Sequence, residues 1–366
     1  MKSRTPLYRR SPHVLLYWDG DHLVFETYAP PLTRVSATAV TFDILKLYDR
    51  WRPAEALFRH MPQFSRSSLQ KTLNELVKNF LLDCSRSSSR AEGEPTSGWE
   101  SWNPWAGLLH FQTKDVPFDT DLEQTFDDLR RRAEAAPPPP PIKEYSRSRC
   151  WVLPEPPVLT EFPRVLLARR TWRQFSRASL KIADLGTLLG LTWGVQRWLK
   201  APGIGRYPLK TSPSSGALHP IEAYVLAARV TGLPRGLYHY NSQHHRLELL
   251  RKGVTPAQIE TYLAGQWWFR SAAALILMTA VFPRTQWKYE TARAYRAVLT
   301  ESGHLCQTFC LVATWLSLAP FCTLALADSR IEKDLGVDGV HESVLYAAGV
   351  GVRPSHRTWS PVPAPR

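Results

Sequence analysis

Pro213-Ser214-Ser215-Gly216-Ala217-Leu218-His219-Pro220 is a loop of small residues bounded by prolines, and the apolar run Ala223–Ala228 follows it. A short apolar run of this kind predicts a buried strand. Because serine, glycine and alanine carry little or no side chain, the backbone of such a loop can come close to a flat ligand. We therefore expect a ligand-binding loop that leads into a buried strand.

A dense group of arginines lies earlier in the chain, in Arg169-Arg170-Thr171-Trp172-Arg173. Arginine suits phosphate because its planar guanidinium donates charge-assisted, often paired, hydrogen bonds. The segment therefore predicts a phosphate site. The same arginines are equally compatible with the solvated face of a helix, so the segment alone leaves both interpretations open.

The third feature is the pair Lys288-Tyr289, which precedes a helical pattern over residues 302–318. A lysine whose pKa is lowered by burial can take a proton from a ligand, and a neighbouring tyrosine can relay or donate one. The alternative is a lysine on the surface beside a tyrosine that packs in the core.

Residues from 151 to the end form the domain that carries these features, and its pattern mixes helices with strands, which indicates the α+β class. Helices are predicted over 180–193 and 302–318, and strands over 236–240, 246–250, 272–280 and 346–351, with a further strand beginning at 324–327. His239, His244 and His245 are interpreted as a polar hairpin tip, because no carboxylate or cysteine stands beside them in the sequence.

Residues 1–84 predict a separate small domain with a hairpin and three short helices. The hairpin joins residues 13–18 to 22–27, and the helices are capped by Ser36, cover 54–60, and begin at Ser67 or Ser68. This order resembles a winged helix-turn-helix. An adapter role, peptide recognition and DNA recognition are all compatible with it. DNA is the least favoured, because the third helix offers only Lys71 and Lys78 as cations.

Residues 85–150 are predicted to connect the two domains. They begin with a stretch rich in serine, arginine and glycine, and they end near the polyproline run 137–141, which indicates a stiff spacer. Between these lie Trp99, Trp102 and Trp105. We expect the tryptophans to anchor an arm on a domain surface or a partner subunit, with stacking on nucleic-acid bases as the alternative.

Composition sets broad limits on function. The 366 residues carry a net charge of +14, spread without a long basic block, which by itself favours no particular partner. No apolar run is long enough for a membrane span or a signal-peptide core, so a cytoplasmic protein is predicted. The five cysteines lack metal-site spacing, and Cys306 and Cys310 are interpreted as small core residues on one helix face. No metal site is predicted.

Taken in order, these motifs resemble one family, the SagB-type (McbC-like) dehydrogenases of the nitroreductase superfamily. The resemblance runs through Arg-Arg-Thr-x-Arg-x-Phe, Pro-Ser-Ser-Gly-Ala-Leu-His-Pro, Gly-Leu-Tyr-His-Tyr, Lys-Tyr, Glu-Ser-Gly-His-Leu-Cys-Gln and Gly-Val-Asp-Gly-Val-His-Glu. It covers residues 151–351 and, more loosely, 102–113. It implies a central mixed sheet flanked by helices that binds FMN, and family members often carry an N-terminal winged-helix-like region.

The resemblance also implies residue roles. The FMN phosphate and ribityl chain would contact Arg169, Arg170, Thr171 and Arg173, with Arg353 as a second cation, and the flavin ring would lie along Ser214, Ser215, Gly216 and Ala217. Lys288 and Tyr289 would be the catalytic pair. The implied activity is oxidation of thiazoline or oxazoline rings in a modified precursor peptide, by a homodimer that works with a cyclodehydratase complex. Neither a membrane nor nucleic acid is an expected partner.

The sequence departs from the family pattern on the segment that supports the catalytic pair. Glu290 and Ala294 stand where glycine is common in the family. Two other functions therefore stay open: an NAD(P)H-dependent nitro- or quinone reductase, and a scaffold that binds peptide or DNA without catalysis.

Overall fold

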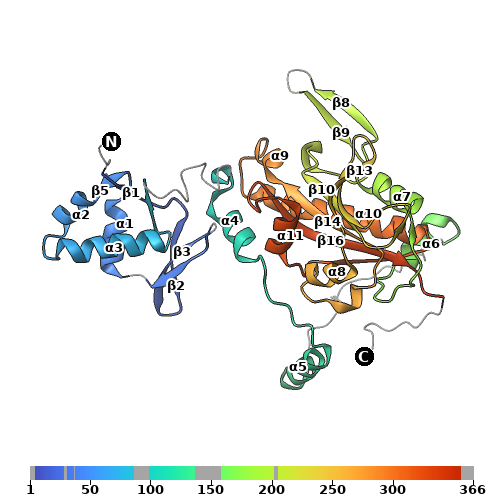
Figure 1. The fold of residues 1–366 in the computed structure, drawn as a ribbon, viewed down its shortest axis with the longest axis horizontal. Helices are drawn as coiled ribbons and strands as arrows, with labels where there is room; N and C mark the ends of the chain where they lie inside the picture. Colours follow the sequence, from blue (N-terminus) through green and yellow to red (C-terminus); the bar gives the residue numbers. More distant parts are fainter. Residues whose placement is uncertain are drawn as a thin grey trace, which may run out of the picture. The chain divides into compact units, whose positions relative to one another are not determined.

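The computed structural model describes residues 5–28, 31–36, 38–85, 99–136, 158–201 and 205–355, and it divides into two compact units (Figure 1). The N-terminal unit contains the chain up to Lys114 together with Phe282–Arg296. The C-terminal unit contains Asp115–Val281 and the chain from Ala297 onward. The domain boundaries predicted at residues 84 and 150 remain predictions. The polyproline run 137–141 lies outside the described residues.

The N-terminal unit begins with two small sheets and three helices. The sheets have the strand orders β5-β1-β6 and β2-β3-β4, and their strands are β1 (Leu7–Arg10), β2 (Val14–Asp19), β3 (His22–Thr27), β4 (Arg34–Ser36), β5 (Arg52–Pro53) and β6 (Leu82–Cys84). The helices are α1 (Ala39–Leu47), α2 (Ala54–His60) and α3 (Arg66–Lys78). The predicted hairpin is confirmed as the antiparallel pair β2–β3. The winged-helix assignment stays a prediction.

Two predicted helix starts in this unit are wrong by two residues or so. The hydroxyl of Thr38, not that of Ser36, accepts the hydrogen bond from the Thr41 amide and caps α1. The hydroxyl of Ser65 likewise accepts from the Ser68 amide and caps α3. Several serines and threonines stand near each helix start, and the one whose side chain reaches the third amide along becomes the cap.

An aromatic cluster forms the rest of the N-terminal unit. It combines the 3-10 turn Glu100–Trp102 and helix α4 (Asn103–Gln112) with helix α9 (Phe282–Gln286) and the first residues of α10 (Arg293–Trp315). The members in mutual ring contact are Trp99, Trp102, His110, Phe111, Phe282 and Tyr295. The predicted anchoring role is confirmed for the buried Trp99 and Trp102, whereas Trp105 is 68% exposed.

The C-terminal unit is built on a six-stranded sheet with the order β13-β12-β10-β14-β16-β15. Its strands are β10 (Ile221–Ala227), β12 (Gly236–Asn241), β13 (Arg246–Lys252), β14 (Ala274–Val281), β15 (Leu318–Thr323) and β16 (Glu342–Val352). Every neighbouring pair in this sheet is antiparallel, which corrects the expected mixed sheet in the described residues. Short connections such as the β12–β13 turn allow antiparallel but not parallel pairing.

Helices and short strand pairs complete this unit and confirm the α+β class. The helices are α5 (Leu122–Ala135), α6 (Glu161–Ala168), α7 (Ile182–Trp193), α8 (Pro256–Tyr262), the main part of α10, and α11 (Asp328–Leu335), with 3-10 turns at Ser215–Ala217 and Trp267–Phe269. β7 (Leu180–Lys181) pairs in parallel with β11 (Val230–Thr231), and β8 (Arg197–Ala201) pairs with β9 (Gly205–Leu209). None of the helices that the structure describes is long and apolar enough to cross a membrane.

The chain after α10 differs from the sequence prediction. The helix begins at Arg293 rather than Ser302, and it ends at Trp315, where Ser317 takes a left-handed backbone with φ of +59°. The next strand is therefore β15, and the strand predicted to begin at 324–327 is wrong. Residues 318–323 pair with β16, whereas residues 324–327 form no strand, although Ala325 and Leu326 are buried.

His239 forms an ion-pair network on the sheet, which the sequence prediction of a polar tip without carboxylates missed. Its two ring nitrogens each lie 3.1 Å from a carboxylate oxygen, one of Glu222 on β10 and one of Glu248 on β13. Strand pairing, not sequence proximity, brings the three side chains together. The hydrogen bond to Glu222, followed by that to Glu248, raises the pKa of His239 above its ordinary value of 6.5.

This raised pKa predicts a pH dependence of stability. Protonated His239 stabilises the fold fully below pH 6.5, and the contribution is lost as the pH rises through the folded-state pKa. We expect the free energy of unfolding to fall across that window in the wild type, and His239→Gln to flatten the fall. Urea unfolding between about pH 5 and 8, where proteins tend to be most stable, measures it. Identical slopes for the two proteins would contradict the assignment.

Candidate functional site

The predicted ligand-binding loop is strained and tightly held. Gly216, Ala217 and His219 have φ values of +65°, +56° and +44°, and the last two are unusual for residues with a Cβ. The hydroxyl of Ser214 accepts a hydrogen bond from the His219 amide at 2.9 Å and donates one to Glu301 Oε2 at 2.5 Å. Backbone strain of this kind persists where surrounding contacts enforce it, and it is concentrated at functional sites.

Glu301, on α10, lies behind this loop; it belongs to the Glu-Ser-Gly-His-Leu-Cys-Gln motif, but the sequence assigned it no role. It is 3% exposed, and its second oxygen, Oε1, lies 3.6 Å from His219 Nδ1 and has no hydrogen-bond partner among the described residues. A buried carboxylate oxygen without a donor is costly, so a bound group with an N–H or O–H would satisfy it. Beside the loop is a cavity of about 340 Å³, lined by Pro213, Ser214, Ser215, Ala297, Thr300, Glu301 and His304.

The arginine segment is a loop rather than a helix face. Helix α6 ends at Ala168, so Arg164 belongs to the helix while Arg169–Arg173 do not. The Trp172 amide donates to the Pro320 carbonyl of β15, and the Ser176 amide donates to the Val352 carbonyl of β16, both at 2.9 Å. The alternative of a solvated helix face is therefore wrong for Arg169–Arg173. The segment is held against the end of the central sheet.

Arg353 and the arginine segment come together at that end of the sheet. The Arg353 guanidinium lies 5.4 Å from the Trp172 ring centroid, and it donates to the carbonyls of Leu318 at 2.8 Å and Thr314 at 3.2 Å. Arg170 is exposed and donates to the carbonyls of Leu167 and Arg169, while Thr171 is exposed. No hydrogen bond among the described residues joins this segment to Ser214–Ala217.

Arg173 is the member of the segment that most needs an anion. It is half-buried, and desolvation lowers its pKa. Within the described residues, it has no hydrogen bond or ion pair. A cation removed from water without a partner is unfavourable, so a phosphate group would offset the cost. The half-buried guanidinium of Arg173 therefore makes the segment suitable for a phosphate-bearing cofactor such as FMN.

We expect Arg173→Ala to weaken FMN binding about 10- to 100-fold, since a charge-assisted hydrogen bond contributes about 1.5–3 kcal/mol. The neighbouring Arg177→Ala removes the same charge from an exposed position and should leave the affinity unchanged. Fluorescence titration of the flavin-free proteins with FMN measures both. Equal affinities for Arg173→Ala and the wild type would remove Arg173 from the phosphate site.

Lys288 and Tyr289 belong to the N-terminal unit, between α9 and α10. Both of their amides donate to the Thr285 carbonyl, and the indole N–H of Trp102 donates to the Tyr289 carbonyl at 2.9 Å. Lys288 Nζ lies 5.5 Å from the Tyr289 ring centroid. The lysine is exposed in this unit, so the burial assumed for a basic lysine is not supplied by the unit itself.

Trp102 has a further role, beyond anchoring, that the sequence did not reveal. Its ring is fully buried in the aromatic cluster, and its single polar atom fixes the backbone of the predicted catalytic pair. The clustered tryptophans were the available signal, but nothing in the sequence connects position 102 with position 289. Two residues near the pair depart from the family pattern. Ala294 is buried, and Glu290 is exposed.

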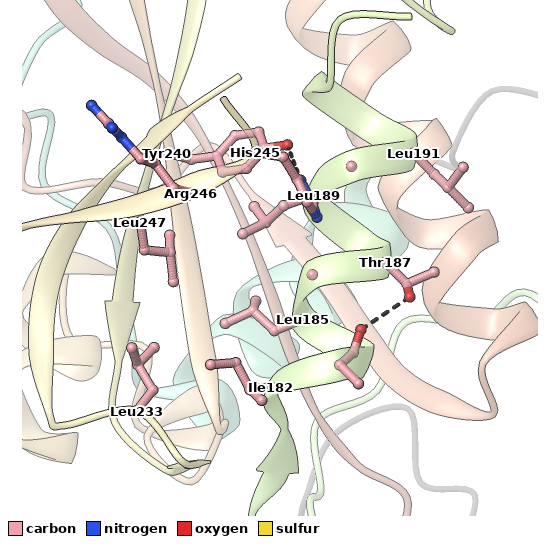
Figure 2. A pocket seen from close by; sticks show the side chains of 13 residues that line it. Ile182, Leu185, Thr187, Leu189, Leu191, Leu233, Tyr240, His245, Arg246 and Leu247 are labelled. Atoms are coloured by element: carbon pink, nitrogen blue, oxygen red, sulfur yellow. Dashed lines mark hydrogen bonds between the residues drawn. The ribbon is translucent and has the colours of Figure 1, made fainter. Parts of the chain in front are cut away.

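A larger pocket, of about 750 Å³, lies between α7 and the β12–β13 hairpin (Figure 2). Its walls are mostly apolar, with five leucines among the 13 lining residues, and the Tyr240 hydroxyl and His245 Nδ1 lie 2.7 Å apart within it. Gly190 leaves room for that imidazole, because a Cβ there would lie 3.0 Å from His245 Cε1. None of the residues predicted from the sequence to bind cofactor or to act in catalysis lines this pocket.

The fold and the residues of this site agree with a family match. Residues 166–352 match the model of the nitroreductase family, and the chain belongs to that family. The matched range holds both residue groups predicted to bind cofactor, as well as Lys288 and Tyr289, while Arg353 is just beyond it. The resemblance to the nitroreductase superfamily that the motifs indicated is therefore confirmed.

Three individual proteins are similar to this chain. Trifolitoxin-processing protein TfxB of Rhizobium leguminosarum bv. trifolii is 30% identical over 156 residues, which is 42% of each protein. "Putative nitroreductase MJ1384" of Methanocaldococcus jannaschii is 28% identical over 173 residues, 47% of this chain and 83% of that protein. The structure of the E. coli microcin synthetase McbBCD complex with truncated pro-MccB17 matches at 19% identity and a TM-score of 0.43, over 65% of this chain and 95% of that one.

Proposed function

We propose that this protein is an FMN-dependent oxidoreductase that oxidises thiazoline or oxazoline rings of a precursor peptide to thiazole or oxazole. The observation that carries the flavin part is the half-buried Arg173 without an anionic partner, in the segment that Arg353 joins. The peptide part is supported by the Lys288-Tyr289 motif and by the similarity to a trifolitoxin-processing protein.

In this proposal the phosphate and ribityl chain are held by Arg169, Arg170, Thr171 and Arg173, with Arg353 adding charge. The strained loop Ser214–Ala217 presents its backbone to the ring, and the carboxylate of Glu301 keeps that loop in place through Ser214. Bound FMN supplies a two-electron acceptor for the hydride equivalent that leaves the azoline. The protein supplies position and proton handling.

Lys288 takes the proton that leaves the ring carbon, and the Tyr289 hydroxyl relays or donates a proton. Lys288 is exposed in its own unit, so its ammonium is open to contact with a bound peptide. Trp102 holds the backbone of the pair in place through its hydrogen bond to the Tyr289 carbonyl. The rate then depends on peptide binding as well as on chemistry.

The partners follow from the same proposal. A cyclodehydratase complex must supply the azoline, since the ring exists only after dehydration of a cysteine, serine or threonine with the preceding amide. The N-terminal sheets and helices would recognise the precursor peptide or dock the partner enzyme. We propose a homodimer in the cytoplasm, with neither nucleic acid nor a membrane as a partner.

A second candidate is a reductase that takes hydride from NAD(P)H and passes it to a nitroarene or quinone. The similarity to the MJ1384 protein, over 83% of that protein's length, favours this candidate. The two functions differ in what reduces the flavin, so they can be separated directly.

The deciding experiment mixes the flavin-loaded protein with each reductant under anaerobic conditions and follows the visible flavin absorbance. An azoline peptide should bleach the flavin rapidly, whereas NADH and NADPH should bleach it slowly. The cofactor released by heat should be FMN. Rapid bleaching by NAD(P)H alone would favour the reductase, and a protein that binds no added FMN would overturn both flavin functions.

A further inference from the structure

Three cysteines that the sequence separates form one cluster in the C-terminal unit. Cys306 and Cys310 lie on α10, Cys322 lies on β15, and all three sulfur atoms are within 4.8 Å of one another. The two helical cysteines are 3% and 4% exposed, and Cys322 is half-buried. In the described part of the chain, the three are free thiols.

The spacing of the sulfur atoms fits a metal centre. A zinc–thiolate bond of about 2.3 Å places tetrahedral sulfur ligands about 3.8 Å apart, so closing from at most 4.8 Å needs a shift of about 1 Å. Residues four apart on a helix lie on one face, which fixes the first two ligands. The neighbouring strand supplies the third, and for this reason the sequence showed no metal-site spacing.

The chemistry around the sulfurs fits a divalent soft cation. Three thiolates and one Zn²⁺ leave one net negative charge, and the positive charge of Arg169 acts on both Cys310 and Cys322. Tyr346, on the paired strand β16, is close enough to Cys322 for its hydroxyl to influence the thiol, the kind of outer contact that orients a metal ligand. Without a metal, neighbouring buried thiols stabilise one another only slightly, because thiols are weak hydrogen-bond donors and acceptors.

We propose that Cys306, Cys310 and Cys322 bind a zinc ion that ties α10 to β15. The two elements joined in this way also carry Thr314 and Leu318, whose carbonyls hold Arg353. The metal would therefore brace the part of the unit from which Arg353 projects. This proposal does not rest on the azoline activity, and its test reads metal binding rather than turnover.

The experiment uses the full-length protein, reduced and stripped of metal, titrated with Co²⁺. Three cysteine ligands predict a thiolate-to-cobalt charge-transfer band that saturates at one metal per chain, and Zn²⁺ should abolish it. Cys84→Ser, which changes a cysteine of the N-terminal unit, should behave like the wild type. Cys322→Ser should bind Zn²⁺ at least about 100-fold more weakly, since disturbing even outer contacts costs about 10- to 100-fold.

Measurements on the wild type alone can contradict the proposal, so the test does not depend on whether the variants fold. Absence of the charge-transfer band in folded, reduced wild type would contradict the site. A disulfide within the cluster of anaerobically purified protein, seen by mass spectrometry of alkylated peptides, would also contradict it. So would a Cys306→Ser/Cys310→Ser/Cys322→Ser variant that folds and binds Zn²⁺ as tightly as the wild type.

Discussion

Lys288→Ala is expected to lower the rate of azoline oxidation about 10²- to 10⁴-fold, the range that a positioned acid or base contributes. The reason is that Lys288 is proposed to receive the proton that leaves the ring carbon. Flavin affinity should be unchanged, because Lys288 is not among the residues proposed to bind FMN. Single-turnover bleaching of the flavin by an azoline peptide measures the effect without interference from reoxidation.

Tyr289→Phe removes only the hydroxyl and provides the companion variant. It should slow the same step and shift the pH dependence of kcat, while Trp102 still donates to the backbone carbonyl at position 289. Lys333→Ala, on helix α11, is a matched control that removes a lysine outside the proposed site. Full-rate oxidation by flavin-loaded Lys288→Ala would remove the catalytic assignment, whatever Tyr289→Phe does.

Gly349→Ala should destabilise the C-terminal unit by about 3 kcal/mol, the upper part of the range for overpacked cores. A Cβ at this position of β16 would lie 2.1 Å from Cζ of Phe321. That ring cannot move aside, because it stacks on Phe269 with centroids 3.8 Å apart and also contacts Phe175. The strand cannot shift either, since β16 pairs with β14 on one side and β15 on the other.

Gly303→Ala is the matched control for this substitution. Gly303 lies within α10, and an added Cβ there meets nothing within 4 Å. Alanine in a helix is about 1 kcal/mol more favourable than glycine, so this variant should be neutral or more stable. Urea unfolding of both variants measures the contrast. A stability of Gly349→Ala equal to that of the wild type would show that the Phe321–Phe269 pair is less constrained than the contacts indicate.

Local patterns in the sequence predicted much of the fold. The apolar run after Pro220 became β10, the central strand next to β14, and the leucines after residue 180 became the buried side of α7. These two predictions are correct because the periodicity of apolar side chains, which reports burial, depends only on residues close together in the sequence. The strand at 318–323 was missed because the helical pattern of α10 runs into it, and only Leu316 and Ser317, the latter with a left-handed backbone, separate the two.

The candidate site was predictable where a motif is contiguous and not where the fold assembles it. Ser214–Ala217 and Arg169–Arg173 stand in continuous segments. By contrast, Glu301 meets Ser214 only through the packing of α10 behind the loop. Cys322 joins Cys306 and Cys310 across a turn, and Glu222 reaches His239 across two paired strands. Such long-range pairings have no local signal in one sequence.

The most direct test of the account is the product formed from an azoline peptide. Purified protein loaded with FMN is incubated with a thiazoline-containing peptide and oxygen, and the peptide mass is measured with and without the flavin. The account predicts the loss of two hydrogen atoms per ring and a new thiazole absorbance, both dependent on FMN. An unchanged peptide mass, from a protein that holds FMN and is rapidly reduced by NAD(P)H, would contradict it.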